Sequence, residues 1–377
     1  MENQVVNNTK RKSNFELLRI ISILFIIGHH FAIHGVHIFN SGAYENASLV
    51  NRAFVDLMLP GGFVGVALFF MITGYFFIDN NRIKILKYII EAIFYGLVIF
   101  ILLIIINLTG YQYPELSSLQ KTQVVMAMIF NPATSYAWWF LCSYILLILM
   151  SPVINKLFNK LDKKGYLILL ILFWILVYSI DKFSSSYYYN LTRGVMFYLI
   201  GGFIKKYYVN GVCNCWYKMM LLLVAFFVGW VSFAFGEYYY YNVSIDGFNV
   251  ILKNSEYLSL IESSILTPIC AISLFLFFTS FSFYSKTINF VAKTTFGIYL
   301  LHDSYISRHF IWHLLLGDGT IITKAIFPLY GLFCVLLAFI VCMLIDIFRM
   351  LFIEKHLLKL ATKIVDDFSK KHVVDEE

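Results

Sequence analysis

Charged residues are scarce in this sequence. Asp, Glu, Lys and Arg make up 14% of the 377 residues, whereas 60% are apolar. So few charged residues cannot cover the surface of one soluble globule, and the composition therefore excludes an ordinary soluble domain. We expect lipid to cover much of the chain.

Cysteines are few and lie mostly inside apolar runs. A disulfide framework needs exposed pairs in an oxidising compartment, so we expect free thiols. Cys213 and Cys215 have no further Cys or His nearby, and two ligands are too few for tetrahedral zinc. The sequence therefore predicts no metal site.

Familiar soluble-enzyme signatures are also missing. No P-loop, dinucleotide fingerprint or internal repeat is visible, and we expect no soluble catalytic domain after the last apolar run. Any chemistry is therefore expected within the membrane domain itself.

Long apolar runs are what the sequence has instead. A membrane-spanning helix needs about 20 mostly apolar residues. The pattern predicts an all-α, polytopic helical bundle at 16–349, with a cytoplasmic segment at 1–15 and a cytoplasmic tail at 350–377. Ten spans are predicted, at 16–36, 56–78, 86–107, 138–155, 166–181, 191–208, 218–236, 263–283, 290–312 and 326–349.

The distribution of Lys and Arg predicts the orientation. With the N-terminus inside, one side of the membrane collects 21 of the 29 basic residues, the other side has seven, and Arg19 lies within the first span. The positive-inside rule then places both termini in the cytoplasm, as expected for a multi-pass protein of the cytoplasmic membrane. The net charge of +7 is explained by topology, so we expect no nucleic-acid partner.

The first span carries ionisable residues along one face. Arg19 and His30 are eleven residues apart, about three helical turns and ~16 Å along the axis, with Glu16 one turn below and His34 one turn above. Charges inside a span are costly and mark functional paths by default. The structural alternative is that Arg19 pairs with Glu16 or extends to the interface while the histidines bond across helices. For His29, which points elsewhere on the helix, we favour that structural role.

Basic residues follow the second span. This span ends with small residues that permit close helix packing, and a short cytoplasmic loop with Arg82, Lys84 and Lys87 comes next. The loop is explained by the positive-inside rule alone, but the same cations could bind a phosphorylated donor.

Two further sets of polar or aromatic residues lie in later spans. His302 and Asp303 place an imidazole and a carboxylate within the ninth span, whereas His309 and His313 near its outer end are expected at the interface. Trp138 and Trp139 open the fourth span and fit an aromatic belt or a sugar-stacking surface. The longer outer loops, at 37–55, 108–137 and 237–262, are rich in Tyr, Asn and Ser and could contact a polyhydroxylated ligand.

These residues together resemble the acyltransferase-3 family of bacterial membrane acyltransferases over nearly the whole chain. The family's Arg and His, eleven residues apart in the first span, fall on Arg19 and His30. The family also has an apolar run that ends in a small residue, Gly and an aromatic residue, and residues 69–75 here are similar to it. Thr73 stands where Ser is usual, and Tyr75 is the aromatic residue. The Trp-Phe-Leu opening at 139–141 and the Gly-Ile-Tyr-Leu-x-His segment at 297–302 are also similar.

The resemblance implies transfer of an acyl group, most often acetyl, from cytoplasmic acyl-CoA to a hydroxyl of a cell-surface or lipid-linked glycan. Neutral imidazole suits proton removal from an alcohol near pH 7. We expect His30 to be the base or a transient acyl carrier. The other expected roles are assistance by His34, orientation of Arg19 by Glu16, donor binding by Arg19, Thr73, Tyr75, Arg82, Lys84 and Lys87, and glycan binding by Trp138, Trp139, His302 and Asp303.

Other readings stay open at this point. Two-component members of the family carry an extracytoplasmic hydrolase-like domain that this chain lacks, so we expect direct transfer or a separate partner protein. A transporter or flippase for a glycan intermediate would also place ionisable residues at mid-membrane. A polysaccharide polymerase would likewise be polytopic. A membrane scaffold would leave the aligned face of the first span unexplained.

Overall fold

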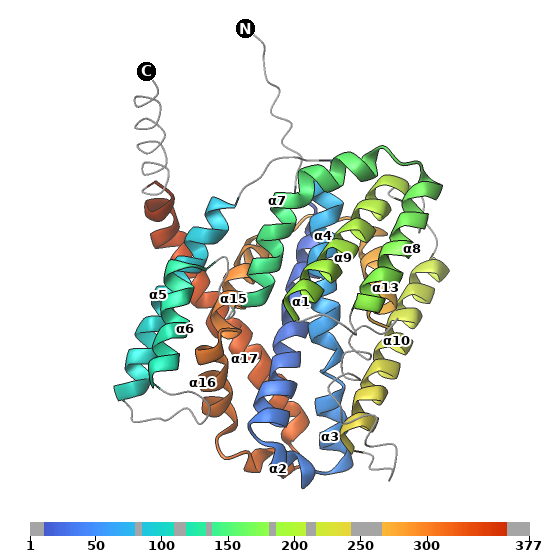
Figure 1. The fold of residues 1–377 in the computed structure, drawn as a ribbon. Coiled ribbons are helices and arrows are strands. Elements are labelled where there is room, and N and C mark those ends of the chain that lie inside the picture. The colour runs from blue at the N-terminus through green and yellow to red at the C-terminus, as the bar shows by residue number, and fades with distance from the viewer. Residues whose placement is uncertain are drawn as a thin grey trace, which may run out of the picture.

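The computed structural model describes residues 11–79, 85–108, 118–132, 138–180, 186–208, 216–242 and 266–359. Within these ranges the regular secondary structure is entirely helical (Figure 1). The elements are α1 (Ser13–His30), η1 (Phe31–Ile38), α2 (Ser41–Glu45), α3 (Leu49–Asp56), α4 (Pro60–Phe77), α5 (Leu86–Leu108), α6 (Ser118–Phe130), α7 (Trp139–Asn159), α8 (Lys163–Ile180), α9 (Ser186–Tyr208), α10 (Trp216–Asn242), α13 (Leu266–Thr279), α14 (Lys286–Val291), η3 (Ala292–Thr294), α15 (Thr295–His302), α16 (Tyr305–Leu316), η4 (Thr320–Thr323), α17 (Phe327–Phe348) and η5 (Arg349–Ile353).

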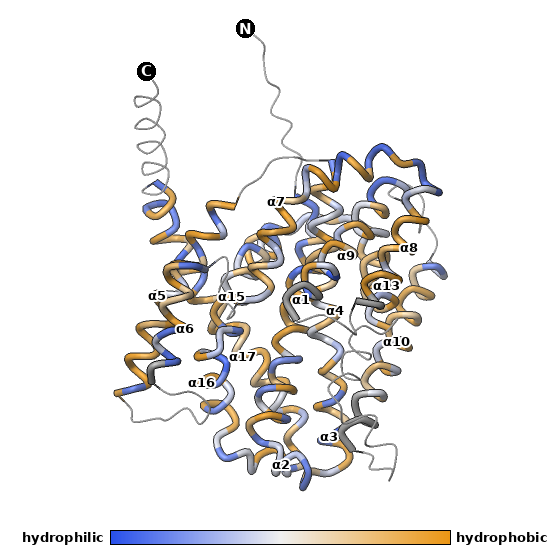
Figure 2. Tube along the Cα trace, in the orientation of Figure 1, coloured by the Kyte–Doolittle hydropathy of each residue, from blue (hydrophilic) through white to orange (hydrophobic). Residues whose placement is uncertain are grey.

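The long helices have the composition of membrane-spanning segments. In the described part of the chain, six helical segments are long and apolar enough to cross a membrane. Most of the length of α5 and α17 is hydrophobic in Figure 2. The predicted all-α membrane bundle is therefore confirmed. A helix lies at each of the ten predicted positions, but the count of ten crossings and the cytoplasmic placement of both termini stay predictions.

Helix α4 lies at the centre of the bundle, packed against α1, α9 and α13. Glycines make these approaches close. A Cβ atom on Gly65 would lie 2.6 Å from the Ser22 carbonyl oxygen of α1, and one on Gly74 would lie 1.8 Å from the Tyr198 carbonyl oxygen of α9. Small residues let helix backbones meet in this way, and the prediction of close packing by the second span is consistent with these contacts.

The predicted ninth span is not one continuous helix. Instead of a single helix over 290–312, the chain forms α14, η3, α15 and α16, with Asp303 in the break between the last two. Ser304 caps α16 because its side chain accepts a hydrogen bond from the Ser307 backbone amide, and the Ser307 hydroxyl donates to the Leu301 carbonyl. Hydroxyl caps of this kind satisfy the free amides at a helix start, so the sequence Asp303-Ser304 ends one helix and begins another.

The predicted outer loop at 108–137 contains a helix. Its described part includes α6, which packs against α5, and Val125 and Met128 are fully buried in that contact. The apolar residues of α6 are too few for a span, so the sequence pattern was consistent with a loop. Packing against α5 supplies the partner that stabilises the helix.

The C-terminal end of the first span is a π-helix. α1 continues without a break into η1, whose turns are wider than those of an α-helix. His34 lies in this segment, with its ring centroid 5.5 Å from that of His30. The two imidazoles are therefore adjacent, as the sequence predicts, although the segment is a π-helix and not the α-helix expected from the sequence.

Candidate active site

The N-terminal part of α1, predicted to be the inner part, presents a fixed cation. The Arg19 guanidinium donates from NH1 to both carboxylate oxygens of Glu16, at 2.9 and 3.0 Å. Arg11 Nε lies 3.3 Å from the same carboxylate, which is buried. Two arginines thus share one acid, which fits both the predicted orientation of Arg19 by Glu16 and the structural alternative of a simple ion pair, so a catalytic role for Glu16 stays a prediction.

The C-terminal end of α1, predicted to be the outer end, presents imidazoles that contact α15. His30 Nδ1 lies 3.0 Å from His302 Nε2, and His30 Nε2 lies 3.4 Å from Asp303 Oδ1. His302 Nδ1 is 2.7 Å from the carbonyl oxygen of Ile298, one turn earlier in α15. His30 therefore contacts two of the four residues that the sequence had assigned to glycan binding, and these contacts between helices also fit the structural alternative for the histidines.

Arg308 closes this group from α16. Its NH1 donates to His34 Nε2 at 3.0 Å and lies 3.7 Å from Asp303 Oδ1. The break after α15 makes this possible, because Asp303 lies in the break and Arg308 in the first turns of α16, and they contact the imidazoles of α1 and η1. The outer cluster, defined as His30, His34, His302, Asp303 and Arg308, therefore combines three imidazoles with one acid and one fixed cation.

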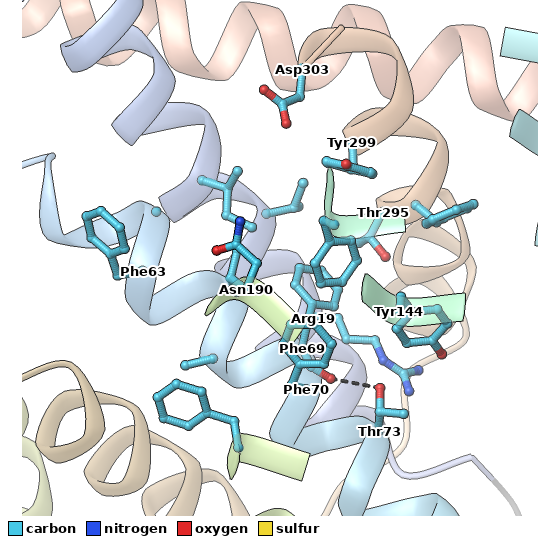
Figure 3. A pocket seen from close by; sticks show the side chains of 18 of the residues that line it. Arg19, Phe63, Phe69, Phe70, Thr73, Tyr144, Asn190, Thr295, Tyr299 and Asp303 are labelled. Atoms are coloured by element: carbon cyan, nitrogen blue, oxygen red, sulfur yellow. Dashed lines mark hydrogen bonds between the residues drawn. The ribbon is translucent and has the colours of Figure 1, made fainter. Parts of the chain in front are cut away.

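One cavity of about 720 Å³ connects Arg19 with the outer cluster. Arg19 and Thr73 lie near one end of the view in Figure 3, and Tyr299 and Asp303 near the other. Between them, Ile23 and Ile26 of α1 and several aromatic rings give an apolar stretch. Its polar and aromatic wall includes Arg11, Arg19, His29, His30, His34, Thr73, Lys87, Trp139, Tyr144, Asn190, Arg193, Lys293, Tyr299, Asp303 and Arg308.

The residues predicted to bind the donor differ in whether they line the cavity. Thr73 lines the cavity and its hydroxyl donates to the Phe69 carbonyl at 2.9 Å. Lys87 also lines it, and its ammonium lies 2.7 Å from Glu354. Tyr75 is buried outside the cavity wall, with its ring 4.6 Å from that of Phe15. Arg82 and Lys84 lie outside the described residues, so their roles stay predictions.

The residues predicted to bind the glycan also differ in whether they line the cavity. Trp139 lines the cavity, whereas Trp138 is fully buried and donates its indole N–H to the Leu300 carbonyl at 3.0 Å. Trp138 therefore holds α15 in place near the outer cluster. Asp303 lines the cavity, and His302 stands behind His30 with 1% of its surface exposed. Binding of a glycan by any of the four stays a prediction.

Several cavity residues had not been assigned to the site from sequence. Arg308 and Arg193 line the cavity, and both belong to the seven basic residues that the charge pattern had placed on the outer side. Because the positive-inside rule disfavours cations there, their presence was a usable signal. His29 also lines the cavity, although its Nδ1 lies 2.6 Å from the Leu59 carbonyl, in keeping with the structural role favoured for it.

Comparison with known proteins gives a family. No curated protein and no solved structure matches the chain significantly. The family model described as an acyltransferase domain, Acyl_transf_3, matches residues 12–347. This match covers α1 to α17, including both ends of the cavity. The chain thus belongs to the acyltransferase-3 family and is a membrane acyltransferase.

Proposed function

We propose that this protein is a membrane O-acyltransferase, and that it transfers an acyl group, acetyl in the simplest case, from cytoplasmic acyl-CoA to a hydroxyl of an extracytoplasmic or lipid-linked glycan. The observation that carries the proposal is the single cavity lined by both Arg19 and His30. If either residue faced lipid, the cavity would not connect an anion of the donor, bound at Arg19, with the base His30.

The inner end of the cavity suits an anionic donor. Arg19, Lys87 and Lys293 supply cationic groups from α1, α5 and η3, and Arg11 adds one from the segment before α1. Guanidinium groups bind phosphate through paired hydrogen bonds. Arg19 and His30 are ~16 Å apart along α1. A donor held by phosphate near Arg19 therefore needs a long arm to bring its acyl group to His30. Coenzyme A has such an arm in its pantetheine, and the apolar stretch between the two ends suits that chain.

The outer end suits acyl transfer to an alcohol. In the proposed step, His30 Nε2 takes the hydroxyl proton as the oxygen attacks the thioester carbon. The carbon–sulfur bond then breaks, and the proton passes from His30 to the leaving thiolate, which gives the ester and free CoA. Asp303 Oδ1, 3.4 Å from Nε2, stabilises the imidazolium in between. Arg308 is the nearest fixed cation for the negative oxygen of the tetrahedral intermediate.

The acceptor is proposed from the outer surroundings of this cluster. Trp139 and Asn190 line the cavity, and an aromatic face with an amide is a combination that binds sugars. A glycan could reach His30 directly or be presented by a separate extracytoplasmic protein.

Radiolabelled acetyl-CoA given to proteoliposomes of the purified protein tests the proposal. Label should move to an added glycan acceptor, and His30→Ala should abolish this transfer. His313→Ala, an exposed histidine of α16 outside the cavity wall, is the matched control and should transfer normally. Normal transfer by inserted His30→Ala protein would remove His30 from the mechanism.

The same experiment separates the rival functions. A transporter or flippase would move the glycan without consuming acetyl-CoA, and a polymerase would change its chain length. Mass spectrometry of surface polysaccharide from cells with and without the protein should show the loss of an acetyl mass. An unchanged acetyl content would argue against a surface-glycan acceptor.

A further inference from the structure

We propose that His302 is a positioning residue, which holds the neutral His30 ring in the tautomer that leaves its Nε2 nitrogen as the proton acceptor. The role of His30 as a base rests on the proposed function. The tautomer itself rests only on the contacts around the two rings.

The hydrogen on His302 is located by a backbone carbonyl. His302 Nδ1 lies 2.7 Å from the Ile298 carbonyl oxygen, and a carbonyl oxygen can only accept. Nδ1 therefore carries the hydrogen, and in a neutral ring Nε2 is then an acceptor. With 1% of its surface exposed, His302 has little access to water that could offer another arrangement.

His30 must complement that acceptor. Its Nδ1 lies 3.0 Å from His302 Nε2, so one of the two nitrogens has to donate to the other. Because His302 Nε2 accepts, His30 Nδ1 carries the hydrogen and His30 Nε2 carries the lone pair. In the opposite tautomer two lone pairs would face each other at 3.0 Å. The ring would then have no acceptor nitrogen for a substrate hydroxyl.

Among the other ionisable groups around His30, Asp303 opposes this assignment, because its Oδ1 lies 3.4 Å from Nε2 and a carboxylate there favours hydrogen on Nε2. The contact of Nδ1 with His302 Nε2 is shorter, at 3.0 Å, and we infer that it prevails. His34 accepts from Arg308 through its own Nε2, so this nitrogen is already used. His29 directs its Nδ1 to the Leu59 carbonyl. Among these groups, His302 is the one whose contact determines which nitrogen of His30 carries hydrogen.

The end of α15 holds His302 in this position. The Asp303 backbone amide donates to the Tyr299 carbonyl at 3.1 Å, and the Trp138 indole donates to the Leu300 carbonyl. These bonds fix the last turn of α15, so the His302 ring is directed by both its helix and its neighbours. A side chain fixed on two sides can impose a tautomer on a third group.

Two substitutions at this position test the assignment. His302→Gln keeps an oxygen that accepts from His30 Nδ1, whereas His302→Leu keeps similar bulk without an acceptor. Solid-state NMR of ¹⁵N-histidine-labelled protein in bilayers reads the tautomer, with His30 identified by comparison with His30→Gln. We expect hydrogen on Nδ1 of His30 in the parent protein and in His302→Gln, and loss of this preference in His302→Leu.

Turnover gives an independent readout. With labelled acetyl-CoA, His302→Leu should lower kcat at least about tenfold and leave KM for the donor unchanged, because Arg19 is three turns away. His302→Gln should restore most of the lost turnover, and His313→Leu serves as the control.

Hydrogen on Nε2 of neutral His30 in the parent protein would overturn the inference, as would a normal kcat in His302→Leu. If the parent protein shows the expected tautomer but consumes no acyl-CoA, the proposed function fails while the positioning role stands.

Discussion

At the scale of single residues, Arg19 is the side chain whose change should most clearly affect the donor. Arg19→Gln removes a guanidinium from the cavity wall but leaves Glu16 paired with Arg11, so the helix end should remain intact. A lost charge-assisted hydrogen bond is worth about 1.5–3 kcal/mol. The KM for acyl-CoA should therefore rise about ten- to a hundredfold, with a smaller effect on kcat. Lys355→Gln, an exposed cation outside the cavity wall, should leave KM unchanged. A normal KM in Arg19→Gln would contradict donor binding by Arg19.

Asp303 should affect the chemical step instead. Asp303→Asn keeps the shape of the side chain but removes the negative charge 3.4 Å from His30 Nε2. Loss of a carboxylate that stabilises an imidazolium typically costs a large factor in turnover, so kcat should fall about a hundredfold or more. Steady-state kinetics with labelled donor measures this, and KM for acyl-CoA should stay constant. Asp318→Asn, in the exposed turn after α16, is the matched change. Equal kcat values in the two variants would show that the charge of Asp303 plays no part.

At the scale of elements, the crossing of α4 and α9 depends on glycine. A Cβ on Gly74 would lie 1.8 Å from the Tyr198 carbonyl oxygen, so Gly74→Ala must push the two helices apart. Overpacking of this kind costs about 1–3 kcal/mol. The variant should unfold at a lower temperature in detergent. Gly236→Ala in α10 places its Cβ in open space and should be neutral or slightly stabilising, because alanine favours a helix. Similar melting temperatures for both variants would mean that the crossing tolerates a wider spacing.

At the scale of the whole molecule, a buried charge cluster ties α5 to α17 and η5. Arg349 donates to Asp346 at 2.6 Å and to Glu91 at 2.9 Å, and the Tyr95 hydroxyl also donates to Asp346. Arg349→Met would leave two buried carboxylates without their common cation, which costs about 3–5 kcal/mol. We expect a strong loss of folded protein in detergent gel filtration, whereas Lys355→Met should behave as the parent. A normal elution profile for Arg349→Met would show that the cluster is dispensable for folding.

The orientation in the membrane is also a property of the whole molecule. The short helix α2 and the turn between α7 and α8 lie at opposite ends of the bundle (Figure 1). Asn46→Cys in the first region and Lys164→Cys in the second replace exposed side chains. An impermeant maleimide added to intact cells should label Asn46→Cys, and should label Lys164→Cys only after permeabilisation. The parent chain controls for its own cysteines, and the reverse pattern would invert the predicted topology.

Sequence alone was enough to predict the membrane class, the helical bundle and the placement of Arg19 and His30 on one face of the first span. Apolar run length sets which segments enter lipid, and helical periodicity sets which residues share a face, so both follow from local sequence. Helix packing was needed to show that His302 contacts His30 and that Arg308 lies between His34 and Asp303. His30 and His302 are 272 positions apart, and His34 and Arg308 are 274 apart, so periodicity within one segment does not specify these contacts.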